Sequence, residues 1–397
     1  MSVDLERLKY LQAADVYKRG RLSGHLTRTE AAATTFTYDV DYLGAGLPSV
    51  ATTLPIAGHP VTSPGGGLPA FFSGLLPEGH RLTVLRDATK TSFDDELTLL
   101  MAVGGDVPGD VQIVPRGESP AQPRSLADVT DPGELDFAVL AESVDLRALP
   151  GVQPKASASM LTSPVSFRNG HFILKLDPPN HKHLVQNEAA HLLAVKTLKL
   201  PIASATVVHD KNGLSGLLVR RFDRRKSAEG WASLPLEDGA QVMGLPPAAK
   251  YGVSSEAVVQ ALTATTKASV VAARNLYLQF VFAWLTGNGD LHAKNVSVLG
   301  NGSGDFAIAP IYDIPCTLVY GDETMALSIS GRTRNIRKRH WAAFAHEIGL
   351  PKKAAESAHA LALRAAGSVD LSALPFSGSP LNRAIRELRQ RRFELGD

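Results

Sequence analysis

The sequence contains a single cysteine, Cys316, among 397 residues. One thiol can form neither an internal disulfide nor a cysteine-based zinc site, and this scarcity fits a reducing cytosol. No apolar run approaches the roughly 18 residues of a membrane-spanning helix, and the charged first ten residues lack the apolar core of a signal peptide. The chain also has no large excess of positive or negative charge, because it contains 41 basic and 39 acidic residues. No overall electrostatic field therefore indicates binding to nucleic acid. We therefore expect a cytoplasmic protein without a membrane partner.

The chain is long enough for two or three domains with hydrophobic cores of their own. Its composition, 44% hydrophobic and 20% charged, is that of a globular protein. Three regions are predicted: a β-rich N-terminal subdomain over 1–115, a mixed region over 116–250 and a helical C-terminal lobe over 251–397. The stretch 116–134, rich in proline, serine and charge, is the first expected boundary.

Hydrophobic patterning predicts the elements within these regions. Alternating apolar and polar residues predict strands over 35–43, 171–178, 204–210 and 214–223. Helical spacing or length predicts helices over 187–200, 258–269, 275–287, 339–350 and 354–369. In the first of these helices, the residues expected to be available for burial are Ala190, Leu193, Val195 and Leu198.

The most informative stretch is GNGDLHAKN, residues 287–295. A long apolar run precedes it and a short one follows, so a buried helix is expected to enter a polar loop and a strand to leave it. Asp290 and Asn295 lie five positions apart on this loop. Phosphotransferases need such a pair, with the aspartate orienting an attacking hydroxyl and the asparagine holding magnesium. Asp313, in an apolar strand predicted over 311–314, is the candidate for the main metal ligand, and the three residues together suit a hard cation.

Each of these residues also has an ordinary structural interpretation. A single aspartate or asparagine in a glycine-containing loop is usually a turn former. His292, between the two, could be a packed and hydrogen-bonded histidine, an interpretation preferred to a metal ligand. The order, spacing and apolar flanks of the whole pattern favour catalysis over three independent turns.

A kinase also needs a phosphate-covering loop, a lysine on a strand and a glutamate on the next helix. Lys175 lies in the strand predicted over 171–178, and Glu188 follows thirteen residues later. An ion pair between them would hold the lysine against the nucleotide phosphates. Alternatively, Lys175 is an edge-strand lysine that opposes aggregation, and Glu188 a first-turn carboxylate behind Asn187 as N-cap. The loop 149–160 could cover phosphates, but it matches neither common glycine-rich pattern.

In this order the motifs resemble those of the HipA-type serine/threonine kinase toxins of bacterial toxin–antitoxin modules. The segments that carry the resemblance are GLLPEG (74–79), GGDVPGDVQ (104–112), GVQPK (151–155), ILKLDP (173–178), NE (187–188), LVRRFDR (218–224), PPAAKYG (246–252), GNGDLHAKN (287–295) and IYDI (311–314). The resemblance implies an α+β, two-lobed protein-kinase-like fold with an additional β-rich N-terminal subdomain. It also implies ATP and Mg²⁺ as cofactors, phosphorylation of a protein such as an aminoacyl-tRNA synthetase, and a helix-turn-helix antitoxin that would link the chain to operator DNA.

The resemblance assigns roles to individual residues of this chain. Catalysis would depend on Asp290, Lys175 and Glu188, and the metal would be held by Asn295 and Asp313. The residues expected to bind the nucleotide are Gly151, Val152, Gln153, Lys155, Lys175, Arg220, Phe222, Asp223 and His292.

Two positions depart from the family pattern. Ala148 stands where the family often has a serine whose autophosphorylation ejects the phosphate loop, so this switch is absent or displaced to Ser157 or Ser159. Arg220 replaces a family glutamate, whose contact is expected through the backbone. Two other functions stay open: a small-molecule kinase of the aminoglycoside-phosphotransferase type, and an inactive partner that only joins an antitoxin in repression.

A basic cluster lies at 331–341. It is either a solvated surface or a binding site for an anionic partner, through phosphate contacts without base specificity. Its five cations are Arg332, Arg334, Arg337, Lys338 and Arg339.

Overall fold

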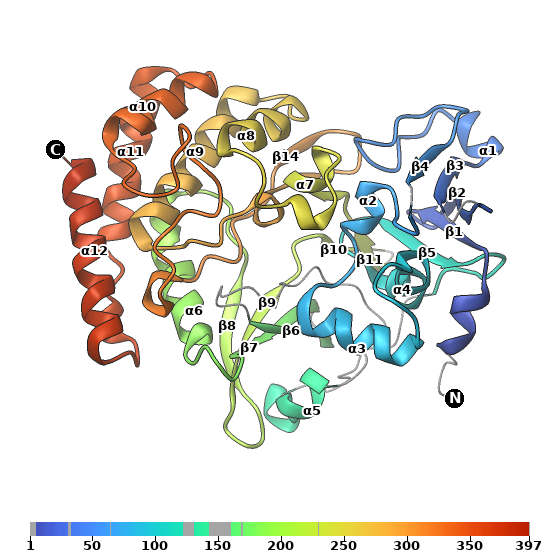
Figure 1. The fold of residues 1–397 in the computed structure, drawn as a ribbon, viewed down its shortest axis with the longest axis horizontal. Coiled ribbons are helices and arrows are strands. Elements are labelled where there is room, and N and C mark those ends of the chain that lie inside the picture. The colour runs from blue at the N-terminus through green and yellow to red at the C-terminus, as the bar shows by residue number, and fades with distance from the viewer. Residues whose placement is uncertain are drawn as a thin grey trace.

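The computed structural model describes residues 5–30, 33–63, 65–121, 131–142, 160–167, 170–228 and 230–396. Figure 1 shows a β-rich N-terminal domain, residues 5–121, and a helical lobe at opposite ends of the long axis. A four-stranded sheet lies between them, and the C-terminal helix forms the outer edge of the helical lobe. The architecture is therefore α+β, as predicted.

The N-terminal domain is built on an antiparallel sheet in the order β4-β3-β2-β1-β5. Buried Val16, Leu26 and Phe36 from this sheet share a separate core with the helices that cover it. The elements are β1 (Ala13–Lys18), β2 (Arg21–Arg28), β3 (Thr34–Tyr38), β4 (Val61–Ser63), β5 (Val111–Pro115), α1 (Val40–Leu43), α2 (Ala70–Ser73), α3 (Gly79–Thr89) and α4 (Glu96–Val103).

Two features of this domain differ from the sequence prediction. The strand predicted over 35–43 ends at Tyr38, because the Asp39 carboxylate accepts hydrogen bonds from the backbone N–H groups of Asp41 and Tyr42 and caps helix α1. The predominantly β prediction also missed α3 and α4. Seven of the eight residues of α4 are buried, so its sequence is apolar on every side and shows no helical period.

The central sheet is antiparallel, in the order β6-β7-β9-β8, and confirms the strands predicted in this region. A hairpin of β10 and β11 follows it. The elements of this part are α5 (Phe137–Glu142), β6 (Leu161–Phe167), β7 (Gly170–Leu176), α6 (Leu184–Ala194), β8 (Ala205–His209), β9 (Ser215–Arg220), β10 (Arg224–Ser227) and β11 (Gly230–Ser233).

Helix α6 begins three residues earlier than predicted and ends at Ala194 in a 3₁₀ turn. Asn187 is therefore not its N-cap. The buried face also differs from the prediction: Leu192 is 4% exposed, whereas Leu193, predicted for the core, is 65% exposed and Ala190 is half-buried. Val195 and Leu198 are buried, but on the 3₁₀ turn rather than on the helix.

The helical lobe is organised around α9, in which 13 of 18 residues are buried. Its end at Gly287 requires glycine, since the backbone there is left-handed with φ of 75° and a Cβ atom would lie 2.8 Å from the Cβ of Leu318. The lobe contains α8 (Ser255–Ala264), α9 (Ser269–Thr286), α10 (Lys338–Glu347), α11 (Lys352–Gly367) and α12 (Gly378–Gly396). The first four were predicted, and α12 was missed.

A small sheet in the order β12-β13-β14 joins the chain before the helical lobe to the strand that leaves the 287–295 loop. Its elements are β12 (Leu236–Asp238), β13 (Ser297–Gly300) and β14 (Phe306–Ile308), and α7 (Gly239–Val242) follows β12. Beyond it, the strand predicted over 311–314 is wrong, because Ile311 makes only an isolated bridge to Ile202. No helix among the described residues is long and apolar enough to span a membrane.

Candidate active site

A pocket with an empty volume of about 1160 Å³, part of it open to solvent, lies where all three parts of the chain meet. Ile173 and Val219 of the central sheet and Tyr312 of the helical lobe supply apolar walls. Leu75 and Glu78 reach it from the N-terminal domain. The mixture of apolar walls and convergent charged groups is typical of a small-molecule site.

Lys175 is the cation at which separate segments converge. Its Nζ lies 2.8 Å from both carboxylate oxygens of Glu188 on α6 and 2.8 Å from Oδ1 of Asp313. Lys175 and Glu188 are 8% and 1% exposed. Burial opposes the charge of the lysine, but Asp313 and Glu188 together hold its pKa above the usual value. The ion pair predicted between Lys175 and Glu188 is thus present in the structure.

Asp313 is held in an uncommon backbone conformation. Its φ is 56°, in the left-handed region that residues other than glycine rarely adopt. Three residues later, Cys316 is clamped by Asn187, whose side-chain amide donates to the backbone carbonyl and accepts from the backbone N–H, both at 2.9 Å. Although burial disfavours its charge, the ammonium of Lys175 keeps the pKa of Asp313 low, so the carboxylate stays ionised. Helix α6 therefore supplies both Glu188 and the clamp on the chain beyond Asp313.

The 287–295 loop is fastened by its own backbone. The side-chain amide of Asn295 donates to the backbone carbonyl of Asp290 at 2.9 Å, which leaves its amide oxygen for another partner. The phenolic O–H of Tyr251 donates to Oδ1 of Asp290 at 3.0 Å. Burial, and next the charge of Asp313, raise the pKa of Asp290 to about 7. A carboxylate with such a pKa suits a general base.

His292 is a neutral residue of this loop. Burial first, and then the charge of Lys250, lower its pKa to about 3. Its Nδ1 accepts from the backbone N–H of Lys294 at 3.2 Å, which places the ring proton on Nε2. That Nε2 lies 4.0 Å from Oδ1 of Asp290 and has no hydrogen-bond partner among the described residues. The ring is therefore packed and hydrogen-bonded, with one donor left beside the pocket.

Most of the residues predicted for the site come together. Those that line the pocket are Lys175, Arg220, Phe222, Asp223, His292, Asn295 and Asp313. Asp290 and Glu188 are buried directly behind this lining. Gly151, Val152, Gln153 and Lys155, like Ala148, Ser157 and Ser159, lie outside the described residues.

Asp223 lines the pocket with its carboxylate already occupied. Oδ2 accepts from Arg221 and from Arg224, both at 2.8 Å, and from the backbone N–H of Gly109 at 3.0 Å. Although burial opposes ionisation, the two guanidinium groups hold the pKa of Asp223 well below its usual range. Asp106 forms ion pairs with the same two arginines, so this network ties the N-terminal domain to the segment that leads from β9 into β10. The carboxylate of Asp223 is engaged in this structural network, and its predicted nucleotide contact remains a prediction.

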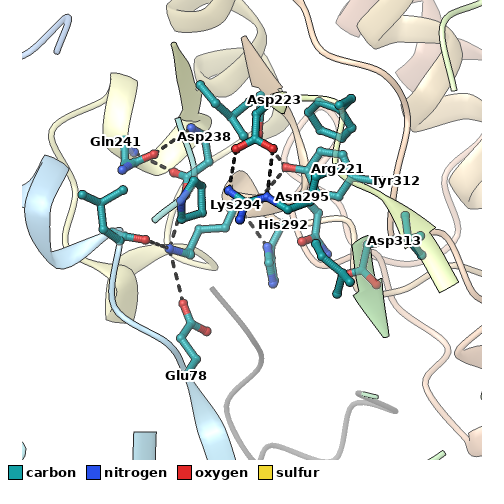
Figure 2. A pocket seen from close by; sticks show the side chains of 18 of the residues that line it. Glu78, Arg221, Asp223, Asp238, Gln241, His292, Lys294, Asn295, Tyr312 and Asp313 are labelled. Atoms are coloured by element: carbon teal, nitrogen blue, oxygen red, sulfur yellow. Dashed lines mark hydrogen bonds and ion pairs between the residues drawn. The ribbon is translucent and has the colours of Figure 1, made fainter. Parts of the chain in front are cut away.

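Five charged residues that line the pocket were not predicted as site residues: Glu78, Arg221, Asp238, Lys250 and Lys294. Figure 2 shows the side chain of Lys294 extending between Asp238 and Glu78. The segments around Glu78 and Lys250 contributed to the family resemblance, but only as motifs. Neither segment has a period or a spacing that assigns chemistry to a particular side chain.

Comparison with known proteins identifies the family. A family model described as the HipA-like C-terminal domain matches residues 147–369, more than half of the chain. This chain belongs to the HipA family. A second model, the HipA N-terminal domain, matches residues 14–114.

Individual relatives agree. The putative kinase Y4dM of Sinorhizobium fredii is 31% identical over 293 residues, which cover 68% of this chain and 67% of the relative. The serine/threonine-protein kinase toxin HipA of Shewanella oneidensis is 28% identical over 358 residues, covering 81% and 80%. The solved structure of the Shewanella oneidensis HipA, HipB and operator DNA complex has a chain with a TM-score of 0.73 and 21% identity, with coverage of 96% and 95%. The predicted family, the kinase-like fold and the enzyme class of serine/threonine protein kinase are confirmed.

Proposed function

We propose that this HipA-family kinase acts as the toxin of a toxin–antitoxin module and transfers the γ-phosphoryl group of ATP to a serine or threonine of a protein. The observation that carries the proposal is the convergence on Lys175, where a strand lysine, a helix glutamate and the aspartate after the catalytic loop meet within 2.8 Å. Kinases use this arrangement to hold nucleotide phosphates and metal.

The side chains of this chain have separate roles in the proposed reaction. Lys175, positioned by Glu188, contacts the nucleotide phosphates. Asp290 orients the acceptor hydroxyl and takes its proton as the oxygen bonds to the γ-phosphorus, and the bond to the bridging oxygen of ADP breaks. The neutral Nε2–H of His292 offers a hydrogen bond beside this position. Ile173, Val219 and Phe222 line the pocket and would provide apolar surroundings for the adenine ring of ATP.

Asn295 and Asp313 fit a magnesium ion. The amide nitrogen of Asn295 is engaged by the backbone of Asp290, so its oxygen is the atom available to a cation, and Asp313 supplies an ionised carboxylate. The described residues contain no cluster of three or more His, Cys, Asp or Glu side chains suited to a metal. Mg²⁺ commonly takes one or two protein oxygens and completes its shell with substrate phosphates and waters. When bound, the ion would neutralise charge on the phosphates.

The phosphate-covering role of 151–155 remains part of the proposal, as does a cytoplasmic location. The solved relative is a complex of HipA, HipB and operator DNA, which supports a helix-turn-helix antitoxin as partner of this chain and operator DNA as an indirect one. An aminoacyl-tRNA synthetase is the proposed class of substrate.

The five cations of the 331–341 cluster are exposed and form none of the ion pairs found between described residues. Two residues of the cluster contact the ring of His340: Nε of Arg339 lies 3.3 Å from Nε2, and the backbone N–H of Arg337 donates to Nδ1 at 2.9 Å. Both interpretations of the cluster, a solvated surface and a phosphate-binding surface, remain compatible with this geometry.

The experiment that tests the proposal is incubation of the protein with γ-labelled ATP, Mg²⁺ and a bacterial lysate, followed by mass spectrometry of the labelled proteins. We expect stoichiometric label on a serine or threonine of one protein. Label on a small molecule would favour an aminoglycoside-phosphotransferase-type activity instead. No label, with repression by the antitoxin intact, would favour an inactive co-repressor.

A further inference from the structure

Glu78 connects the N-terminal domain to the active-site pocket. It lies between α2 and α3 and is 7% exposed. One carboxylate oxygen, Oε2, accepts from Nζ of Lys250 at 2.5 Å, and Oε1 lies 3.5 Å from Nζ of Lys294 (Figure 2 shows the second contact). Both lysines line the pocket, and they are 1% and 6% exposed. A single carboxylate of the N-terminal domain thus contacts two buried cations of the kinase site.

Lys294 lies inside the catalytic loop, directly before Asn295. Its ammonium donates to the backbone carbonyl of Gly74 at 2.9 Å and lies 3.2 Å from Oδ2 of Asp238. Gly74 and Glu78 belong to the same N-terminal segment, so this domain holds the Lys294 side chain at two points. The loop that presents Asn295 is therefore anchored from outside the kinase lobes.

Lys250 provides the second connection. Its backbone carbonyl accepts from the N–H of Ala293 in the catalytic loop at 3.2 Å. Its neighbour Tyr251 donates to Asp290 at 3.0 Å, and the Tyr251 ring packs edge-on against the His292 ring with centroids 5.0 Å apart. A displacement of Lys250 would thus move the hydroxyl that orients Asp290.

The burial of these charges makes the contact with Glu78 consequential. A buried ammonium that loses its counter-ion keeps its desolvation cost and loses the attraction that offset it. Lys250 would then be expected to move toward solvent, and the backbone around it would move as well. Lys294 would retain Asp238 and Gly74, so the loop would loosen rather than detach.

We infer that Glu78 is a positioning residue for phosphoryl transfer, through which the N-terminal domain fixes Lys250, Tyr251 and Lys294 and so sets the geometry of Asp290 and Asn295. The inference rests on the proposed function of Asp290. It makes the N-terminal domain part of the kinase active site.

The first test is Glu78→Gln, with initial rates of label transfer from γ-labelled Mg-ATP to lysate protein. We expect kcat to fall about 10- to 100-fold, as for misplacement of a reacting group by ~1 Å, and the KM for ATP to stay nearly unchanged. Tyr251→Phe should lower kcat similarly, and the double variant should lose less than the product of the two factors, because both act on Asp290.

The matched control is Glu237→Gln. Glu237 also joins the kinase lobes to the N-terminal domain, where it accepts from the N–H and O–H of Thr52, at 3.0 Å and 2.7 Å for the closest contacts. It contacts none of the pocket lysines by hydrogen bond. We expect this variant to keep its kcat even where its melting temperature changes. An equal kcat loss in both variants would mean that general loosening of the interface is responsible and would overturn the assignment to Glu78.

A second readout does not depend on activity. Amide hydrogen exchange over residues 288–295 should accelerate in Glu78→Gln and stay unchanged in Glu237→Gln. If Glu78→Gln does not fold, Glu78→Asp keeps the charge but shortens the side chain, and intermediate acceleration is expected. Protected loop amides in the altered Glu78 protein would overturn the inference. If wild type is inactive while the exchange result holds, the proposed function fails and the positioning contact survives.

A different kinetic outcome would also be decisive. If Glu78→Gln raises kcat or lowers the KM for ATP, Glu78 competes with nucleotide phosphates for the two lysines. That result would contradict a positioning role.

Discussion

Replacing Lys175 by methionine removes a cation shared by two carboxylates. Its Nζ is 2.8 Å from both oxygens of Glu188 and from Oδ1 of Asp313, and its side chain is almost fully buried. Methionine fills a similar volume, so packing changes little. The substitution therefore isolates the effect of the charge.

The structure indicates the size of the effect. Removing one partner of a buried ion pair typically costs about 3–5 kcal/mol, because the remaining charge stays desolvated. Here Glu188 and Asp313 both lose their cation, which places Lys175→Met at the upper end. Glu188→Gln should cost less, about 1–3 kcal/mol, because Lys175 keeps Asp313. The destabilisation of the double variant should be smaller than the sum of the two single-variant destabilisations, by about 0.5–3 kcal/mol.

Two assays measure the double-mutant cycle formed by Lys175→Met, Glu188→Gln and the variant that carries both. Denaturant unfolding gives the stability of each variant, and initial rates at varied ATP give the kinetic counterpart, in which both single variants should have a raised KM for ATP or a lowered kcat. Additive effects within about 0.5 kcal/mol in both assays would refute a shared interaction and favour independent roles for Lys175 and Glu188.

The remaining predictions concern the metal and the domain interface. Asp313→Ala and Asn295→Ala should both weaken Mg-ATP binding measured by calorimetry, Asp313→Ala more, because a carboxylate carries a full charge and an amide does not; unchanged affinity in Asp313→Ala would contradict the metal assignment. Burial, with a smaller contribution from the charge of Asp238, raises the pKa of Glu237 to about 7, so the folded state binds the proton of this carboxyl more tightly than the unfolded chain does. The protonated carboxyl of Glu237 therefore contributes to the free energy of unfolding. This contribution is complete below the ordinary pKa near 4.5 and is lost as pH rises through 7, by at most about 3 kcal/mol. Denaturant unfolding of Glu237→Gln should show no such loss of stability between pH 4.5 and pH 8. A pH dependence equal to that of wild type would contradict the raised pKa of Glu237.

The sequence could predict those parts of the site whose chemistry follows from local spacing. Asp290 and Asn295 share one loop, and Lys175 and Glu188 are only thirteen residues apart. The flanking strand and helix have clear apolar patterns, so their types were predictable. Only the structure or the family resemblance could show that these residues meet at one site.

The rest depended on long-range packing. Glu78 and Lys250 are separated by 172 residues, and their segments have no periodicity. The apolar neighbours of Asp313 predict a strand, but the residue lies in an irregular segment, with a positive φ, that is held by contacts with Lys175 and, farther along, Asn187. Leu193 was predicted for the core although Leu192 is the buried residue, because two adjacent leucines leave the local apolar spacing unable to decide which of them faces the core.

The central claim is that Asp290 orients and deprotonates the acceptor hydroxyl, and the most direct test compares wild type with Asp290→Asn. Asparagine preserves the shape of the side chain and removes the proton acceptor. Transfer of label from γ-labelled ATP to the substrate protein should fall about 10²–10⁴-fold, while calorimetry shows Mg-ATP still bound. Transfer within tenfold of wild type would contradict the account.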